Sequence, residues 1–423
     1  MRRASAAGSS RARGAVCAVF PLFFIGSCSF LEPSAALLWT DRPEFALYAE
    51  YFNSSQNQYK VEIRYVSSLA QKLSDPKETP DILVGGWLKS AATRRQFKPL
   101  DRLFKRELLS KTAFYSRLLE LGTIDGRQYL LPVSFNLPAL VFTRANGQLL
   151  SNPFTVGFEE MKTLGAAHNR EQNGVYSQMG FSPAWDSEFL YIAVSLCNAD
   201  FQEGDPLAWD AEALDRAVGY IREWMHANAG VQGEDDFVFK YFYEPPVVLA
   251  LSGRILFTYM SSEEFFTLPQ ERRANLDFRW IAEHDAIPLA EETVYYGKYK
   301  KGKAGKAADA FTRWFFCAET QELLLEISRN ERLTETLFGI SNGFSALRSV
   351  TEQVFPRFYP SLLGHIPPAG FLMPPRILPY NWTALKERVI LPYLLEKIRA
   401  EDSAHVRDLE KQIADWYRVN REF

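Results

Sequence analysis

The chain has 423 residues, enough for two or three domains rather than one small domain. Hydrophobic residues make up 47% and charged residues 23%, as in ordinary soluble globular proteins with a sizeable core. The formal net charge is −3 and the basic runs are short, so composition gives no support for a nucleic-acid partner. Aromatic residues reach 14%, which fits either core filling or a cleft lined with rings.

The N-terminus has the order of residues of a secretory signal peptide. Four arginines precede an apolar run at 15–25, which is too short to span a bilayer as a mature helix. The segment Ile25-Gly26-Ser27-Cys28 follows and resembles the bacterial lipobox. The resemblance implies cleavage before Cys28, a diacylglyceryl thioether on its sulfur and attachment to a membrane through acyl chains. The alternative is an ordinary signal peptide with an incidental cysteine.

Two further cysteines remain in the predicted mature chain, since Cys17 leaves with the signal peptide. Cys197 and Cys317 both lie in apolar helical patterns, which predicts buried free thiols. There is no CxxC pattern in the sequence, so neither a thioredoxin motif nor a cysteine metal site is indicated.

The first third of the mature chain alternates between strand and helix patterns. An apolar strand is predicted at 36–39, a helix at 43–53 with Pro43 in its first turn, a strand at 60–66, a helix near 69–73 and a buried strand at 81–84. This order predicts a parallel α/β lobe.

The remaining pattern is mixed. Residues 123–143 contain two extended runs with a tight turn at Asp125-Gly126. Helices dominate 158–224, and the stripe at 211–225 is the clearest of them. Strand patterns return at 254–260 and 278–282, a long helix is predicted at 304–328, and the chain beyond 340 is helical with proline interruptions.

Five segments then occur in an order that is typical of one family. They are KPLDRLF at 98–104, DGRQYLLPV at 125–133, VFTR at 141–144, GRILFTYM at 253–260 and the helix pattern at 304–328. Together they resemble the family 1 extracellular solute-binding proteins, the maltose-binding-protein-like receptors of ABC importers, over about 37–350. Ile255-Leu256 and Tyr295-Tyr296-Gly297 depart from the family pattern near the expected cleft, which leaves the ligand class open.

The resemblance implies a two-lobed α/β fold of the type II periplasmic-binding-protein class, with lobes joined by crossing strands and a helical C-terminal segment. Residues 1–27 are the predicted lipoprotein signal peptide and 28–36 a tether. Lobe one is expected at 37–132 and 290–327, and lobe two at 133–289 and 328–423. The resemblance places the ligand between the lobes, where strand ends of open α/β sheets generally bind ligands.

Sugar recognition needs ring faces for stacking and a few aimed polar groups. The candidate ligand-binding residues are Trp39, Asp41, Arg42, Trp87, Phe135, Asn136, Trp185, Tyr259, Ser261 and Tyr296. Two of them keep a structural alternative: Asp41 as the N-cap of the helix at 43–53, and Trp87 as a core ring. If the ligand is charged, we expect Asp41, Arg42 and Lys89 to dominate the cavity instead.

No catalytic constellation is visible. The sequence has five histidines but no HExxH motif, no GxSxG elbow and no P-loop spacing, so we expect no catalytic residue, no metal and no cofactor. The resemblance then implies a monomeric, membrane-anchored binding protein rather than an enzyme, one that captures a small solute, with carbohydrate favoured, and delivers it to ABC importer permease subunits. The alternative is a surface interaction or accessory lipoprotein on a retained solute-binding scaffold.

Overall fold

The computed structural model describes residues 34–74, 78–105, 108–401 and 405–420. The predicted signal peptide, Cys28 and most of the predicted tether lie outside these residues. Ser34–Phe423 clusters as one compact unit. Of the helices in the described ranges, none combines the length and the apolar character needed to span a bilayer.

The first of two main sheets is built mostly from the N-terminal third of the chain. Within the described residues it has six strands in the order β15-β6-β14-β3-β1-β2. The strands are β1 (Ser34–Thr40), β2 (Tyr59–Tyr65), β3 (Ile82–Gly85), β6 (Leu130–Phe135), β14 (Val294–Lys298) and β15 (Phe344–Ser345). β1 pairs in parallel with β2 and β3, whereas β14 runs antiparallel to β3 and β6. The predicted parallel α/β lobe is confirmed, and we call the part built on this sheet the first lobe.

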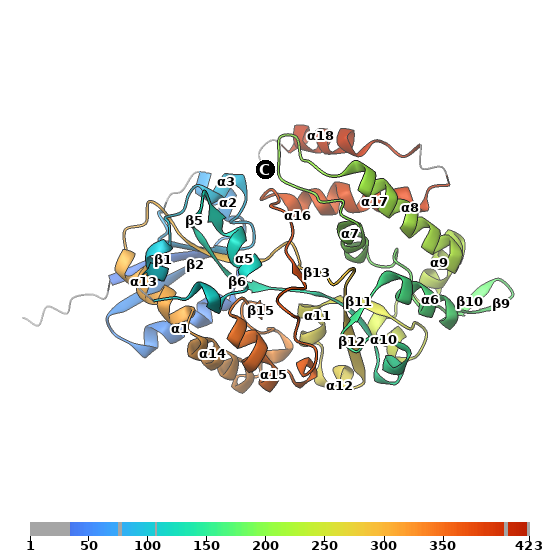
Figure 1. The fold of residues 1–423 in the computed structure, drawn as a ribbon, viewed down its shortest axis with the longest axis horizontal. Coiled ribbons are helices and arrows are strands. Elements are labelled where there is room, and N and C mark those ends of the chain that lie inside the picture. The colour runs from blue at the N-terminus through green and yellow to red at the C-terminus, as the bar shows by residue number, and fades with distance from the viewer. Residues whose placement is uncertain (1–33, 75–77, 106–107, 402–404, 421–423) are drawn as a thin grey trace, which may run out of the picture. The chain divides into compact units, whose positions relative to one another are not determined.

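Helices α1 (Glu44–Ser55) and α13 (Gly305–Phe315) pack together against the first sheet (Figure 1). Each helix buries one stripe of residues three or four apart, the spacing of a helix face that meets a core. Aromatic rings carry the contact: the centroids of Phe52 and Phe311 lie 5.3 Å apart, edge to face. The other helical elements up to 121, and those from 318 to 362, are α2 (Leu69–Ser74), α3 (Ala91–Arg94), α4 (Asp101–Lys105), η1 (Lys111–Ala113), α5 (Ser116–Leu121), α14 (Ala318–Asn330), η3 (Leu333–Glu335), η4 (Val350–Val354), α15 (Phe355–Phe358) and η5 (Pro360–Leu362).

The predicted single helix at 304–328 is wrong in one respect, because the chain forms two helices, α13 and α14. The break lies at Phe316 and Cys317, where Cys317 has the extended backbone of a helix N-cap. Packing explains it, since the break lets the consecutive rings of Phe315 and Phe316 both enter the core.

The second sheet carries the second lobe. Within the described residues it has four strands in the order β11-β7-β12-β8. They are β7 (Pro138–Thr143), β8 (Thr155–Val156), β11 (Thr258–Ser261) and β12 (Leu276–Ile281). The helical elements that follow these strands in the chain are η2 (Arg144–Leu149), α6 (Phe158–His168), α7 (Ser187–Leu196), α8 (Ala211–Asn228), α9 (Gly230–Lys240), α10 (Pro246–Leu251), α11 (Ser262–Thr267), α12 (Gln270–Arg273), α16 (Trp382–Leu385), the π-helical turn η6 (Lys386–Ile390), α17 (Leu391–Arg399) and α18 (Leu409–Val419). α17 packs against α7 and α8, so the C-terminal segment completes this lobe (Figure 1).

Three small pairs complete the strands. Hairpins form between β4 (Thr123–Ile124) and β5 (Arg127–Gln128), and between β9 (Arg170–Gln172) and β10 (Val175–Gln178). The predicted turn at Asp125-Gly126 is confirmed, with φ of 49° and 74°, which the glycine adopts without steric cost. Between the main sheets, β13 (Ile287–Pro288) pairs in parallel with β16 (Leu372–Met373).

The lobes are joined where strands of one sheet lead into the other. β6 continues through Asn136 and Leu137 into β7, and β12 leads through β13 into β14. Asn136 fastens these connections: its side chain donates to the Asn342 carbonyl at 2.7 Å and accepts from Ser262 Oγ at 2.6 Å. Its carbonyl accepts from the Ala290 amide at 3.0 Å. The exact lobe boundaries stay a prediction. β15 lies in the range 328–423 that was expected in lobe two, but it pairs with β6 in the first sheet.

Cys197 and Cys317 are free thiols, as predicted. Both are partly exposed rather than fully buried. Each lies at the end of a helix rather than inside one, Cys197 as the C-cap of α7 and Cys317 as the N-cap of α14, which explains the exposure.

Candidate functional site

One cavity lies at the carboxyl ends of the parallel strands, and we call it the strand-end pocket. Its volume is about 400 Å³. The first lobe contributes Asp41 and Arg42 after β1, Tyr65 at the end of β2, Ser67 after β2, and Trp87 after β3. Because parallel strands end at the same edge of a sheet, residues distant in sequence meet there. Opposite them stand Glu292 from the β13–β14 connection and residues of the C-terminal segment, namely Tyr380, Asn381, Thr383 and Ala384.

Charge in the strand-end pocket is centred on Asp41 and Arg42. Arg42 Nε lies 3.1 Å from Asp41 Oδ1, and its Nη2 donates to Glu292. Burial raises the pKa of Asp41 to about 6, against the opposing effect of Arg42, and Glu292 adds to the rise. Near pH 6 this carboxyl can therefore donate as well as accept a hydrogen bond. Asp41 does not cap α1, whose N-cap is Pro43 without a side-chain cap bond.

Trp87 is half-buried at the wall of the same pocket. It also packs against the hydrophobic core of the second lobe, so it touches both lobes. A ring face in this position suits stacking on a sugar. Trp87 thus serves partly as a core ring and partly as a pocket wall.

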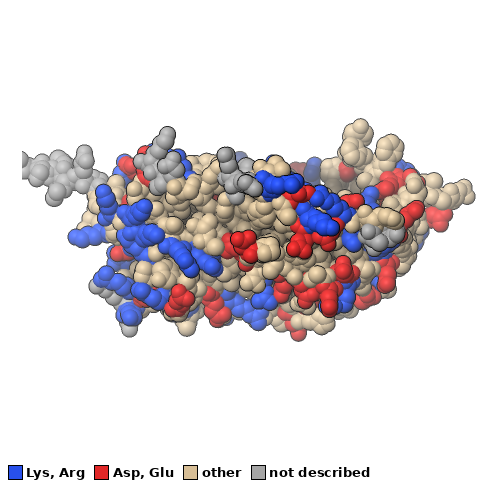
Figure 2. Space-filling model, turned by 90° about the horizontal axis from the view of Figure 1, so that it is seen from above, with Lys and Arg blue, Asp and Glu red and all other residues tan. Residues whose placement is uncertain are grey.

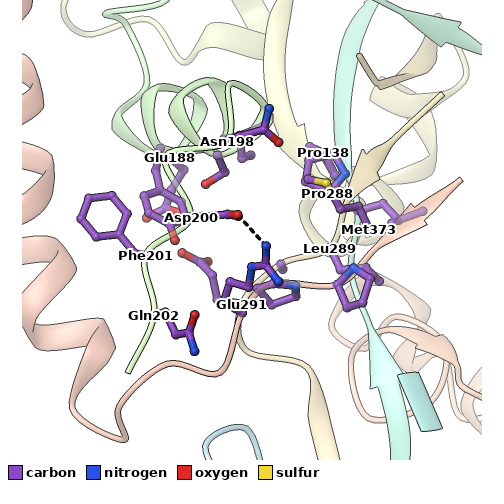
Figure 3. Close-up of a pocket in the computed structure, with 18 of the residues that line it drawn as sticks. Pro138, Glu188, Asn198, Asp200, Phe201, Gln202, Pro288, Leu289, Glu291 and Met373 are labelled. Atoms are coloured by element: carbon purple, nitrogen blue, oxygen red, sulfur yellow. Dashed lines mark hydrogen bonds and ion pairs between the residues drawn. The ribbon is translucent and has the colours of Figure 1, made fainter. Parts of the chain in front are cut away.

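A second cavity of about 550 Å³, the α7 pocket, lies beside α7 and the β13–β16 pair (Figure 3). Its polar lining contains Glu188, Asp200, Glu291 and Arg376. Arg376 Nη2 lies 2.7 Å from Asp200 Oδ2. Its other walls include Leu137, Pro138, Tyr191, Phe201, Tyr259, Ser261, Pro288 and Met373. Apolar walls with a few aimed polar groups are the usual composition of a ligand site.

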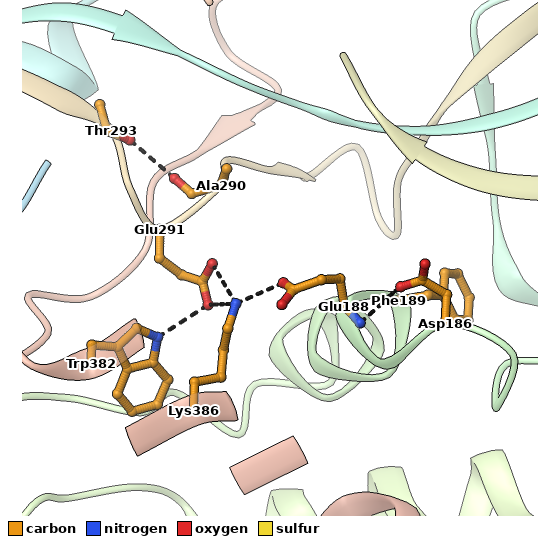
Figure 4. A network of polar contacts seen from close by, with 8 residues as sticks. All are labelled: Asp186, Glu188, Phe189, Ala290, Glu291, Thr293, Trp382 and Lys386. Atoms are coloured by element: carbon orange, nitrogen blue, oxygen red, sulfur yellow. Dashed lines mark hydrogen bonds and ion pairs between the residues drawn. The ribbon is translucent and has the colours of Figure 1, made fainter. Parts of the chain in front are cut away.

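Lys386 lies behind the α7 pocket and holds two of its carboxylates (Figure 4). Its Nζ is 2.6 Å from Glu188 Oε2 and 3.0 Å from Glu291 Oε1, and it sits over the Tyr191 ring at 4.8 Å. Burial alone would lower the pKa of Lys386, but Glu291 and Glu188 outweigh it and raise the pKa above its ordinary value. Trp382 Nε1 donates to Glu291 at 3.2 Å. This ammonium is therefore held charged and fixes the two carboxylates.

The structure brings five of the ten candidate ligand-binding residues to the two pockets. Asp41, Arg42 and Trp87 line the strand-end pocket, and Tyr259 and Ser261 line the α7 pocket. The Ser261 hydroxyl is already engaged, because it accepts from the Glu264 amide in a capping box at the start of α11. Its capacity to meet a ligand is reduced accordingly.

The other five lie elsewhere. Phe135 and Tyr296 are buried in the first lobe, where Phe135 packs on Tyr115 and the Tyr296 hydroxyl bonds Thr312. Trp39 is buried in a first-lobe cluster and borders a third, more open cavity. Asn136 is used by the lobe connections. Trp185 packs in the second lobe, its ring stacked on Phe237 with centroids 5.7 Å apart.

Sequence reasoning missed Glu188, Glu291, Glu292 and Lys386. Lys386 carried a signal, because it lies on the apolar stripe that includes Leu385, Val389 and Ile390, and a lysine in such a stripe requires a buried acid. Glu291 and Glu292 carried a weaker signal, since they directly follow the lobe boundary predicted between 289 and 290. Lys89, in contrast, is buried without an ion pair among the described residues, over the Tyr295 ring at 4.8 Å, and burial lowers its pKa to about 7.

Exposed charges are unevenly distributed over the face seen in Figure 2. Lys and Arg side chains gather toward the left, over the first lobe, and Asp and Glu toward the centre and right. Exposed charges are screened by salt beyond about 10 Å, whereas buried pairs are screened much less. The partly buried pairs around Arg42 and Lys386 are therefore screened less than these surface charges.

Comparison with solved structures shows which class of fold this is. The chain is similar to the sugar-binding protein MalE from the phytopathogen Xanthomonas citri, with a TM-score of 0.68 and 11% identity over 92% of this chain and 100% of that one. It is also similar to a cyclo/maltodextrin-binding protein complexed with maltotetraose, with a TM-score of 0.61 and 15% identity over 93% of this chain and 99% of that one. The cyclic alpha-maltosyl-1,6-maltose binding protein from Arthrobacter globiformis is similar as well, with a TM-score of 0.60 and 17% identity over 92% of this chain and 99% of that one.

These likenesses establish the fold: the chain has the two-lobed type II architecture of the sugar-binding proteins of ABC importers, as the sequence predicted. No protein-family model matches the sequence, and a comparison with curated proteins found no match. The likeness is therefore one of fold, at 11–17% sequence identity.

Proposed function

We propose that this protein is an extracytoplasmic solute-binding protein that captures a carbohydrate between its lobes and delivers it to an ABC importer. The observation that carries the proposal is the full-length likeness to sugar-binding proteins, combined with a pocket at the strand ends that both lobes line. Trp87 supplies a ring face there, and Asp41, Arg42 and Glu292 supply polar groups for hydroxyls.

The proposal describes binding without catalysis. The acids around the pockets are engaged with cations: Glu188 and Glu291 with Lys386, Asp200 with Arg376, and Asp41 and Glu292 with Arg42. Such paired carboxylates are suited to accepting hydroxyl hydrogen bonds. A ligand that touches both lobes favours the closed arrangement by its differential affinity.

Thermal unfolding in the presence of sugars tests the function. We expect maltose, maltotetraose or mannotriose at 1000 times its dissociation constant to stabilise the folded protein by about 4 kcal/mol through mass action. Differential scanning calorimetry of the purified full-length protein measures the shift, with sorbitol as a control for nonspecific polyol effects. If no sugar in a broad panel raises the melting temperature, the carbohydrate proposal fails and the accessory-lipoprotein alternative gains.

We further propose that Cys28 carries the lipid that holds the protein at the outer side of a bacterial membrane. The support is the order of basic region, apolar run and lipobox-like Ile25–Cys28 segment. Cys28→Ala should move the protein from the membrane fraction to the soluble fraction, because the acyl chains that bury CH₂ groups in the bilayer are lost. Cys317→Ala serves as the matched control and should stay with the membrane. Equal detergent partitioning of Cys28→Ala and wild type would contradict the anchor.

A further inference from the structure

Two consecutive glutamates lie on the connection between β13 and β14 and line different cavities. Glu291 lines the α7 pocket, and Glu292 lines the strand-end pocket. This connection is one of the segments that join the lobes. Each glutamate is held by a cation, and the two cations belong to different lobes.

Glu292 is held by the first lobe. Arg42, directly after β1, donates to Glu292, and burial would lower the pKa of Arg42 but Glu292 and Asp41 raise it. Gly86, directly after β3, leaves room for this acid: a Cβ there would lie 2.4 Å from Glu292 Cγ. A side chain at residue 86 would therefore force Glu292 to shift from this position.

Glu291 is held by the second lobe. Lys386 Nζ lies 3.0 and 3.2 Å from its two oxygens, and Lys386 is itself fixed by Glu188 of α7 at 2.6 Å (Figure 4). The lysine is 6% exposed, and its neighbours Leu385, Val389 and Ile390 belong to the second-lobe core. Arg42 of the first lobe and Lys386 of the second lobe are therefore linked through two ion pairs, to Glu292 and Glu291, which are neighbours in the chain.

The lobes also touch directly in this structure. The Ala91 amide, in the first turn of α3, donates to Glu203 Oε2 of the second lobe at 2.7 Å. Trp87 packs on the second-lobe core. The two lobes are therefore in contact at these two places.

We propose that Glu291 and Glu292 are positioning residues that latch the lobes closed through their ion pairs with Lys386 and Arg42. Rotation of one lobe against the other moves the two cations relative to a pair of adjacent residues, so opening separates at least one pair. The inference rests on the proposed function for its consequence: apparent ligand affinity falls as the closed fraction falls. The latch itself is a property of the chain that does not depend on which solute binds.

Hydrogen exchange at Ala91 tests the latch directly. The first amides of a helix have no intrahelical partner, so protection of Ala91 comes from Glu203 and reports lobe contact. In the ligand-free full chain, mass spectrometry with residue-level fragmentation should show Ala91 exchange accelerated roughly tenfold in Glu291→Gln/Glu292→Gln. The exposed first-lobe pair Lys60–Glu62 provides the control, because Glu62→Gln should leave Ala91 unchanged.

The outcomes separate the latch from the function. Equal Ala91 exchange in wild type and the double variant, with both melting as folded proteins, overturns the latch. Faster exchange, with sugar affinity reduced only in proportion to the fall in the closed fraction, supports both proposals. Faster exchange in a protein that binds no sugar supports the latch and contradicts the proposed function. Glu292→Gln alone offers a milder variant, since this side chain is 46% exposed and its loss leaves the Lys386 cluster intact.

Discussion

Lys386→Met should lower the free energy of unfolding by about 3–5 kcal/mol, because removing one partner of a buried ion cluster leaves charges uncompensated. The Lys386 side chain is 8% exposed and that of Glu291 13%. Without the ammonium, the carboxylates of Glu188 and Glu291 repel each other at the wall of the α7 pocket. Chemical denaturation monitored by circular dichroism measures the loss.

Two further variants make this prediction specific. Glu188→Gln/Lys386→Met/Glu291→Gln should recover most of the lost stability, because a neutral cluster carries no uncompensated charge. Lys60→Met, in the exposed pair with Glu62, should change stability by less than about 1 kcal/mol. A Lys386→Met protein as stable as wild type would show that the cluster contributes nothing to the fold.

Trp185→Ala should cost about 2–4 kcal/mol of stability with little effect on sugar affinity, because its partly buried ring packs against a core and lines neither pocket. The ring stacks on Phe237 and contacts Phe181 at 6.1 Å between centroids. Truncation leaves a cavity that these neighbours close only in part. Denaturation and calorimetric titration with a bound sugar measure the two quantities separately.

Trp87→Ala is the matched comparison and should show the opposite pattern. It removes a ring face from the strand-end pocket together with a contact between the lobes. We expect affinity to fall by about 10–100-fold, the equivalent of one large apolar side chain that leaves water on binding. If Trp185→Ala loses affinity and Trp87→Ala does not, the ligand lies elsewhere than in the strand-end pocket.

Several features of the fold followed from local pattern alone. The apolar runs at 36–39 and 81–84, with amphipathic segments between strands, predicted β1, α1, β2, α2 and β3 in order and in parallel pairing. The turn at Asp125-Gly126 was also predicted correctly from the local sequence. Periodicity reports which side of an element meets a core, so it predicts elements well.

The same pattern was less informative about the site. Asp41, Arg42 and Trp87 were predicted from their place after strands, and topology brings strand ends together. Phe135 and Tyr296 have the same composition cues but are buried in a core, and Trp185 is partly buried against another. An aromatic residue fills a core or faces a pocket according to neighbours that lie far away in the sequence.

By itself, the sequence determined the order of strands and helices in the first third of the mature chain and the residues that follow its parallel strands, because both depend on spacing along the chain. The two-lobed class was implied by the resemblance to a known family. Only the tertiary structure decided that Arg42 meets Glu292 and that Lys386 meets Glu188 and Glu291. These partners are separated by 250, 198 and 95 residues. An ion pair is selected by the position of two side chains in space and by their burial, and neither quantity is encoded in local spacing.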